Sequence, residues 1–286
     1  MNYKVSHPTK VVECEIDLPA SKSISNRLLI IQALCKQEFT ITNLSSSEDT
    51  KSLQKALKAT NATIDVGAAG TSFRFLTAYL STLIGNRYIL TGSNRMKERP
   101  IKELVDALLD LGIEIKYLEK SGFPPLAILG AEITENKVSI DGQISSQFIS
   151  ALLLIAPTLK NGIKLKISGE IVSKPYIIMT LKLMEEFGIS HIWIENTIEI
   201  KPQKYSAKDY NIEADWSAAS FWYEIAALCS SCNIILNGLT ENSIQGDRKV
   251  MELFKNLGVQ TKFKNGSSIL SKKEENNISK EINLIN

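Results

Sequence analysis

Five short motifs place hydroxyl groups, glycine and positive charges where helices are expected to begin. The first covers residues 18–27 and reads LPASKSISNR. On a helix that turns about 100° per residue, one arc of about 140° holds four polar side chains: Lys22, Ser23, Asn26 and Arg27. The opposite side is apolar, as expected of a stripe that faces a core: Ile24, Leu28 and Ile31. The pattern fits an amphipathic surface helix, or a helix start where Ser21 or Ser23 caps and an anion binds.

Two further motifs combine a helix start with arginine. In AAGTSFR (residues 68–74), Gly70 and Thr71 are expected to open a helix, and glycine allows a ligand to approach the backbone. In RMKERPI (residues 95–101), Arg99 precedes Pro100, which suits the first position of the next helix.

The last two motifs are rich in serine. In ISSQF (residues 144–148), either Ser145 or Ser146 can cap a helix, which leaves the other hydroxyl and Gln147 available. In VSKPY (residues 172–176), Ser173 and Lys174 precede a proline in the manner of the arginine motif.

Arginine usage favours anion binding over ordinary helix caps. The chain has six arginines among 33 basic residues, and four lie in or beside these motifs: Arg27, Arg74, Arg95 and Arg99. Arginine binds carboxylate and phosphate through a planar fork that lysine lacks. The motifs therefore predict binding of small polyanions. Arg74 is the weakest of the four candidates, because one turn into its helix it could pair with a carboxylate at the edge of the core.

Composition bounds the class of protein. The 286 residues are 44% hydrophobic and 22% charged, with a net charge of +2, which gives no indication of nucleic acid or membrane-surface binding. No stretch approaches the roughly 20 apolar residues of a membrane span, and the first residues lack the apolar core of a signal peptide. We therefore expect a cytoplasmic protein. Two histidines and one CxxC pair (Cys229 and Cys232) give no metal site, and we expect no metal.

A helix, a break and a strand recur along the chain. The breaks fall at Asn61, Gly112, Gly188 and Gly258, and glycine or asparagine ends a helix in the left-handed conformation at little cost. Further strands and helices lie between these breaks. The pattern predicts an α/β protein built from repeated βαβαββ units with mixed sheets. Residues 271–280 (SKKEENNISK) are interpreted as an exposed polar loop.

A domain boundary is expected near residues 205–214, before a helix that Asp215 can cap. Three repeats precede this boundary and one follows it. We expect residues 19–211 to form a first lobe that carries the binding motifs, and residues 1–18 with 212–286 to form part of a second lobe.

Taken in order, LPASKSISNR, GAAGTSFR, RMKERPI, SSQF and VSKPY resemble the signature stretches of the 5-enolpyruvylshikimate-3-phosphate (EPSP) synthases. The resemblance implies the two-lobed enolpyruvyl transferase fold. It also implies transfer of the carboxyvinyl group of phosphoenolpyruvate to the 5-hydroxyl of shikimate 3-phosphate, with release of phosphate. This reaction belongs to the shikimate pathway of aromatic amino acid biosynthesis and is the target of glyphosate. The family needs no cofactor, and the resemblance implies a monomer.

The resemblance also implies residue roles. The residues that would bind shikimate 3-phosphate are Lys22, Ser23, Arg27, Ser145, Ser146, Gln147, Ser173 and Tyr176. Those that would bind phosphoenolpyruvate are Lys22, Gly70, Thr71, Arg99 and Gln147. Lys22 would act in catalysis by positioning and electrostatics.

The chain departs from the family pattern in places. Ala68 replaces a common asparagine, and Phe75 stands where many relatives have proline. No residue matches the family's acid and base carboxylates, and Glu48 and Asp49 are excluded because SSSEDT (residues 45–50) is interpreted as a capping box. We therefore expect this chain to be inactive alone. The alternatives are a non-catalytic fragment that binds shikimate 3-phosphate, and the related transferase acting on UDP-N-acetylglucosamine, whose early Lys-Asn pair and loop cysteine have no match.

Overall fold

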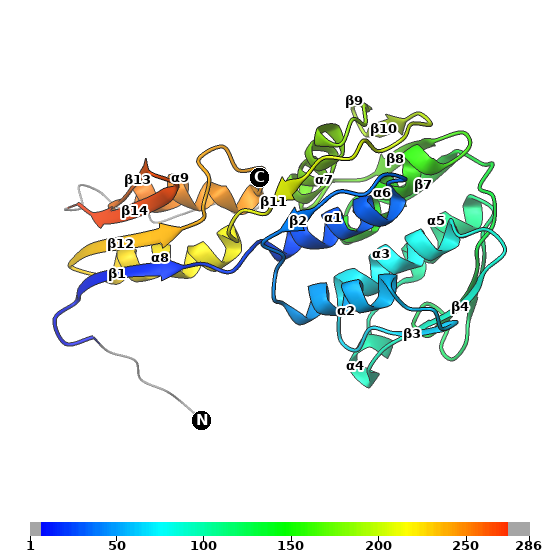
Figure 1. The fold of residues 1–286 in the computed structure, drawn as a ribbon, viewed down its shortest axis with the longest axis horizontal. Helices are drawn as coiled ribbons and strands as arrows, with labels where there is room; N and C mark the ends of the chain where they lie inside the picture. Colours follow the sequence, from blue (N-terminus) through cyan, green and yellow to red (C-terminus); the bar gives the residue numbers. More distant parts are fainter. Residues whose placement is uncertain (1–6, 274–286) are drawn as a thin grey trace. The chain divides into compact units, whose positions relative to one another are not determined.

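The computed structural model describes residues 7–273 and divides the chain into two compact units (Figure 1). One unit is Lys22–Asn211, and the other combines the residues up to Ser21 with those from Ile212 onward. Residues 19–21 thus group with the second unit and not with 22–211. Backbone contacts give the reason: the amide of Ser21 donates to the carbonyl of Glu213, and the amide of Asp215 donates to the carbonyl of Pro19.

The unit of residues 22–211 contains two copies of the predicted βαβαββ repeat. The first copy comprises β3 (Thr63–Asp65), α3 (Gly70–Ser81), β4 (Arg87–Thr91), α4 (Asn94–Lys97), α5 (Lys102–Asp110), β5 (Glu114–Tyr117) and β6 (Leu126–Leu129). The second comprises β7 (Lys137–Asp141), α6 (Ser146–Ile155), the 3-10 turn η1 (Ala156–Thr158), β8 (Ile163–Ser168), α7 (Lys174–Glu186), β9 (Ile192–Ile194) and β10 (Thr197–Ile200). These elements confirm the βαβαββ unit predicted from the sequence. However, residues 22–211 contain two four-stranded copies of it where three repeats were expected, because the remaining elements of this unit form only a two-stranded sheet.

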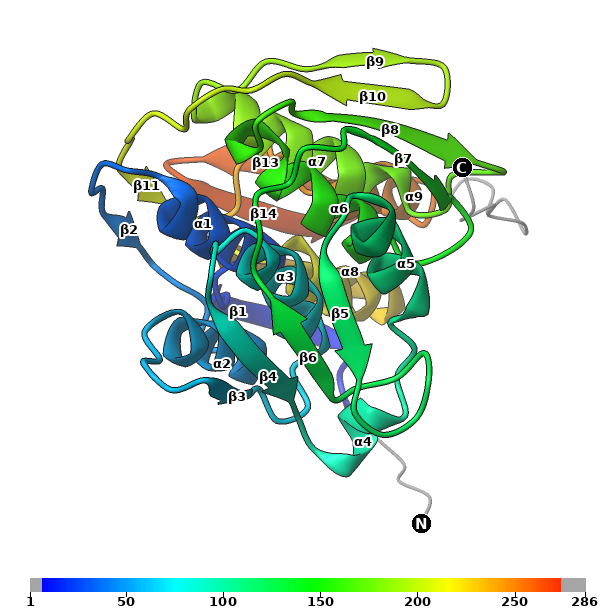
Figure 2. The ribbon, with the colours of Figure 1, turned by 90° about the vertical axis from the view of Figure 1, so that its right-hand side faces the viewer.

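The two sheets have the same topology. Their strand orders are β3-β4-β6-β5 and β7-β8-β10-β9. In each sheet the first two strands are parallel and the remaining neighbours are antiparallel. Figure 2 shows the two sheets on the outside of this unit, with helices α3, α5, α6 and α7 between them. The apolar faces of both sheets are therefore covered by helices.

The rest of this unit is a smaller set of elements. It contains α1 (Lys22–Leu34), β2 (Ile41–Thr42), α2 (Glu48–Leu57) and β11 (Tyr210–Asn211), and β2 and β11 form a two-stranded parallel sheet. The helix and strand on either side of Asn61 therefore belong to different repeats, because β3 begins the next sheet. Asn61 is also not in the left-handed region, whereas Gly112, Gly188 and Gly258 are, with φ of 90°, 83° and 80°.

The second unit is a single repeat assembled from two parts of the chain. Strand β1 (Val11–Asp17) pairs in parallel with β12 (Ser231–Asn237), and β14 (Ser267–Lys272) and β13 (Val259–Lys264) complete the order β1-β12-β14-β13. Helices α8 (Trp216–Leu228) and α9 (Val250–Lys255) follow β1 and β12 in the repeat, and η2 (Gly246–Lys249) precedes α9. The polar loop expected over residues 271–280 was predicted to begin too early, because residues 271 and 272 are the last two of β14. Residues 274–280 of that prediction lie outside the described part of the chain.

Helix α8 buries one face and exposes an apolar stripe. Asp215 caps its start as predicted, accepting from the amides of Ser217 and Ala218. Trp216 and Tyr223 are buried in the core of this unit. Three apolar residues at helical spacing remain exposed to solvent: Phe221 (68%), Ile225 (38%) and Leu228 (74%). Such a stripe favours association.

We therefore expect the chain to self-associate through α8 and the double variant Phe221→Glu, Leu228→Glu to remain monomeric. Sedimentation velocity across a concentration series measures this difference. The matched control is Ile194→Glu, which changes an exposed apolar residue at the edge strand β9 of the other unit. Equal association of the control, the double variant and the unmodified chain would contradict the role of α8.

No helix within residues 7–273 has the length and apolar character needed to cross a membrane. The CxxC pair follows α8: Cys229 is the C-cap of that helix, and Cys232 is the second residue of β12. Both are free thiols.

Candidate anion-binding site

All predicted site residues lie in the unit of residues 22–211, and most lie at helix starts. Lys22 and Gly70 are the first residues of α1 and α3, Ser145 caps α6, and Ser173 immediately precedes α7. These four helix starts agree with the sequence prediction. The start expected at Pro100 does not, because α5 begins two residues later and Arg99 lies in the loop after α4.

Half of the predicted polar arc of α1 is buried: Asn26 and Arg27 are buried, whereas Lys22 and Ser23 at the start of the helix are half-buried. Helix α1 contacts α2, α3, α6 and α7, and its buried polar side chains therefore face neighbouring helices and not solvent. The hydroxyl of Ser25 accepts from the amide of Ser45 at 3.0 Å, and Asn26 accepts from the hydroxyl of Thr50 at 2.8 Å. The surface-helix interpretation of residues 22–31 is therefore wrong.

Arg27 is at the centre of this buried contact, with only 2% of its surface exposed. Its Nε donates to the hydroxyl of Thr180 at 2.7 Å and its Nη2 to the hydroxyl of Ser150 at 3.1 Å. Nη1 donates to the carbonyl of Ser23 at 2.9 Å, and Nη2 also reaches the carbonyl of Tyr176 at 3.4 Å. These contacts use four of the five N–H groups of a guanidinium, so Arg27 ties α1 to α6 and α7 and has one N–H left for a ligand.

Burial lowers the pKa of Arg27 to about 10, because it removes the guanidinium from water. The guanidinium carbon lies 5.5 Å from the centre of the Phe75 ring, which is itself buried. Phe75, one of the departures from the family pattern, thus supplies a cation–π contact in the interior of α3. A proline at this position would lack both the ring and the backbone N–H.

Arg99 lies directly against the start of α3. A Cβ atom built on Gly70 would lie 2.6 Å from Cζ of Arg99 and 2.9 Å from its Nη2, and nearer still to Nη1. Only glycine leaves room for the guanidinium at this helix start. An open cavity of about 450 Å³ adjoins it, lined by Ala68, Arg95, Glu98 and Arg99. The arginine fork and the helix start are therefore brought together beside open space.

Arg74, which the sequence ranks as the weakest of the four arginine candidates, interacts electrostatically with Arg99. Its Nη1 donates to Oε1 of Gln147 at 2.6 Å, which links α3 to α6, and its guanidinium lies 5.2 Å from the centre of the Phe148 ring. The pKa of Arg74 is lowered to about 10, chiefly by burial and also by the positive charge of Arg99, while the negative charge of Asp49 opposes both effects. The hydrogen-bond partner of Arg74 is thus the amide oxygen of Gln147, and the carboxylate of Asp49 lies nearby. In the sequence, the signal for Arg74 was that it is one of only six arginines and lies within a binding motif.

Asp49 lies at the start of α3 although its own helix is α2. Ser47 caps α2 by accepting from the amide of Thr50, so Thr50 stands at the position where the capping box expected from SSSEDT needs an acidic residue. The carboxylate of Asp49 accepts from the amide of Thr71 at 3.3 Å, and its carbonyl accepts from the hydroxyl of Ser72 at 2.6 Å. The carboxylate of Asp49 therefore occupies a backbone N–H that could otherwise bind an anion, and its negative charge partly balances the positive charge of Arg74.

Three of the remaining predicted residues contact the arginines: the carbonyls of Ser23 and Tyr176 accept from Arg27, and the side chain of Gln147 accepts from Arg74. Ser145 accepts from the amide of Gln147, whereas the neighbouring Ser146 is buried. Ser173 has left-handed backbone angles (φ 59°, ψ 34°), and its carbonyl accepts from the amide of Tyr176. Lys22, Ser23, Gln147 and Tyr176 are half-buried.

The geometry defines a repeat-built α/β protein with several cationic and hydroxyl-bearing helix starts in one unit, an arrangement suited to small anions. A family model described as EPSP synthase (3-phosphoshikimate 1-carboxyvinyltransferase) matches residues 6–64 and 52–285. The chain therefore belongs to the EPSP synthase family.

Individual relatives agree with this assignment. The 3-phosphoshikimate 1-carboxyvinyltransferase of Bacteroides fragilis strain YCH46 is 50% identical over 264 residues, which cover 92% of this chain and 64% of the relative. The enzyme of the same name from Haemophilus influenzae strain PittEE is 40% identical, covering 88% and 65%. A solved EPSP synthase from Acinetobacter baumannii shares the fold with a TM-score of 0.75 at 20% identity, covering 92% of this chain and 65% of that one. The chain thus spans about two thirds of the length of these relatives.

Proposed function

We propose that this chain carries the substrate-binding half of a carboxyvinyl transferase, which transfers the carboxyvinyl group of phosphoenolpyruvate to shikimate 3-phosphate. The observation that carries the proposal is the contact of Arg99 with Gly70 at the start of α3, beside an open cavity. A guanidinium fork and a helix N-terminus in contact form a strong site for a carboxylate or phosphate. Membership of the family supports the identity of the two anions.

We assign shikimate 3-phosphate to the side of α1, α6 and α7. Lys22, Ser23, Ser145, Ser146, Ser173 and Tyr176 would surround it, and Arg27 would contribute its remaining N–H. Because Arg27 is so deeply buried, its main contribution is to hold α1 against α6 and α7, and thereby to position Ser23 and Tyr176. The hydroxyl groups of the serines would donate to the anion.

We assign phosphoenolpyruvate to the start of α3. Arg99 would bind it through the planar fork, with Gly70 and Thr71 supplying backbone and hydroxyl groups, and Lys22 and Gln147 contacting both substrates. These residues align the reacting atoms and offset negative charge, which lowers the barrier without any covalent step by the protein. The acid and base carboxylates of the family have no match among these residues, whose roles are binding and positioning.

Calorimetric titration tests the assignment. We expect shikimate 3-phosphate to bind the chain, and phosphoenolpyruvate to bind once shikimate 3-phosphate is present. Arg99→Lys should weaken phosphoenolpyruvate binding selectively, because lysine cannot reproduce the fork. The matched control is Lys166→Gln, which removes an exposed positive charge on β8. Absence of binding by both ligands, or equal effects of Arg99→Lys on the two, would contradict the proposal.

Gly70→Ala is expected to weaken the binding of phosphoenolpyruvate, or of glyphosate as its competitor, several-fold, while the fold is kept. The new Cβ would occupy the position of the Arg99 guanidinium, and the far end of that flexible side chain must move. The same titrations measure the effect, with circular dichroism to check the fold. The control is Gly85→Ala, a glycine with positive φ at the other end of α3, where a Cβ would meet nothing within 4 Å. If Gly70→Ala bound phosphoenolpyruvate with unchanged affinity, Arg99 would not be part of the binding site.

A cytoplasmic location remains a prediction from the sequence composition, and a monomeric state of the complete protein remains a prediction of the family resemblance.

A further inference from the structure

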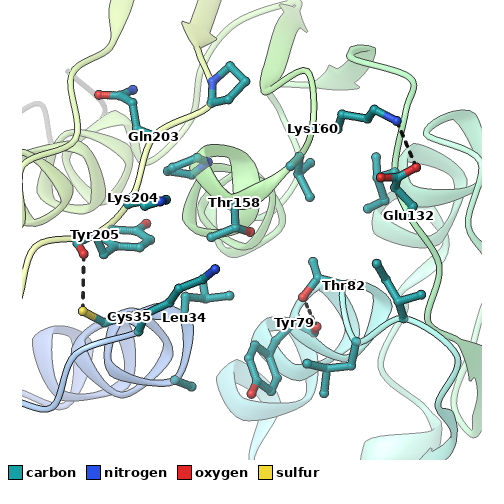
Figure 3. A pocket seen from close by; sticks show the side chains of 18 of the residues that line it. Leu34, Cys35, Tyr79, Thr82, Glu132, Thr158, Lys160, Gln203, Lys204 and Tyr205 are labelled. Carbon is teal, nitrogen blue, oxygen red and sulfur yellow. Dashed lines mark hydrogen bonds and ion pairs between the residues drawn. The ribbon is translucent and has the colours of Figure 1, made fainter.

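A cavity of about 750 Å³ lies at the far end of the helices that begin at the candidate site. Helices α1, α3 and α6 start at Lys22, Gly70 and Ser146, and residues at or just beyond their ends line this cavity. Figure 3 shows Leu34 and Cys35 at the end of one helix, Tyr79 and Thr82 at the end of another, and Thr158 at the end of the third. The cavity and the candidate site are therefore separated by the length of these helices.

The walls of the cavity are mainly apolar. Ile133 and Leu159 are buried, and Leu34 and Leu83 are half-buried beside them. Ile84, at the rim, exposes 65% of its surface to solvent, which is unusual for a large apolar side chain. The volume falls within the range of small-molecule pockets, and such pockets combine apolar walls with a few polar groups. The cavity therefore suits a ligand with an apolar body.

Three of the hydroxyl groups in the walls already donate to helix ends. The hydroxyl of Thr82 donates to the carbonyl of Tyr79 at 2.7 Å, that of Thr158 to Ile155 at 2.8 Å, and that of Tyr205 to Leu154 at 2.8 Å. Their hydrogens are thus committed to the protein. The donors that remain for a ligand are the phenol hydroxyl of Tyr79 and the ammonium groups of lysine, and only the ammonium groups carry a positive charge.

Charge in and around the cavity is slightly positive. Lys36, Lys160 and Lys204 line it together with one acidic residue, Glu132, which pairs with Lys160 at 3.1 Å. Within the described part of the chain, Lys36 and Lys204 make no ion pair. Each helix end contributes about half a negative charge, which leaves a small positive balance. One negative charge on a ligand would be compensated there, whereas two or three would not.

From these observations we infer a second ligand site in this cavity, specific for a hydrophobic monocarboxylate. The apolar body lies between Leu83, Ile84 and Ile133, and the carboxylate accepts hydrogen bonds from Lys36 and Lys204. This ligand differs in class from the small, multiply charged anions proposed for the other end of the helices. The inference does not depend on the proposed function.

The test is calorimetric titration of the chain with 2-naphthoate, compared with its neutral amide. We expect the carboxylate to bind about three to ten times more tightly than the amide, which is the factor that one hydrogen bond supplies. Lys204→Gln should lower the affinity by a similar factor. Ile84→Glu should abolish binding, because it places a negative charge on the apolar rim, and it should not disturb folding because the side chain is exposed.

Two controls locate the site. Lys166→Gln removes a comparable exposed lysine on β8, and Arg99→Lys changes the candidate site at the other end of α3; neither should alter 2-naphthoate binding. Thermal unfolding of each variant verifies that it is folded. The inference is overturned if 2-naphthoate does not bind, if the amide binds equally well, or if Ile84→Glu and Lys204→Gln bind like the unmodified chain.

Discussion

Arg27→Ala is expected to lower the free energy of unfolding of the unit 22–211 by about 3–5 kcal/mol, the range for losing a large buried side chain with its charged hydrogen bonds. The substitution removes four hydrogen bonds, of which three join α1 to Ser150 on α6 and to Tyr176 and Thr180 on α7. The fourth is to the carbonyl of Ser23 within α1. It also removes the contact with the Phe75 ring and leaves a cavity. The hydroxyls of Ser150 and Thr180 can still bond to each other at 2.9 Å, which limits the loss.

Arg27→Met should cost less than Arg27→Ala. Methionine fills most of the volume, and it removes a buried positive charge whose desolvation is itself unfavourable. The exposed Arg95→Ala is the control and should change the stability by less than about 0.5 kcal/mol. Hydrogen-exchange mass spectrometry across a urea series, on peptides from α1 and α6, reports on this unit separately from the other. Similar stability of Arg27→Ala and Arg95→Ala would show that the buried network contributes little.

The sequence predicted most of the fold because each repeat carries its own local signals. Gly112, Gly188 and Gly258 mark the point where a helix ends and a β-hairpin follows, and all three take the positive φ that makes glycine suitable there. The same reasoning fails at Asn61 because the helix and strand beside it belong to different repeats. Which repeat an element joins is decided by strand pairing between distant segments, as in the pairing of β1 with β12 and of β2 with β11. Local pattern contains no information on such pairing.

The candidate site was predicted as a set of helix starts, but not as a set of contacts. The caps formed by Ser145 and Asp215 depend on residues two or three positions away and could be predicted. The burial of Arg27 could not, because a helical projection cannot distinguish a polar face in solvent from one that meets polar groups on other helices. The link between Arg74 and Gln147 joins residues 73 positions apart, and only the packing of α3 against α6 creates it.

Arg74→Ala is expected to weaken phosphoenolpyruvate binding by about 10–100-fold, which corresponds to one hydrogen bond to a charged group. Gln147 can present either its oxygen or its amide hydrogens to a ligand. Because Nη1 of Arg74 occupies Oε1 at 2.6 Å, the Nε2 hydrogens are left for an anion. Without Arg74 the amide can reverse and present its oxygen, which repels the anion. The substitution also removes a positive charge close to Arg99.

A double-mutant cycle distinguishes this mechanism from a general loss of charge. If Arg74 acts by orienting the amide, Gln147→Ala should weaken binding by itself, and adding Arg74→Ala should weaken it by less than the sum of the two single effects. Titration with phosphoenolpyruvate in the presence of shikimate 3-phosphate measures all four affinities. Arg87→Ala, an exposed arginine at the start of β4, controls for net charge. Strictly additive effects would show that the two residues act independently, because a reversed amide can be harmful only while Gln147 is present.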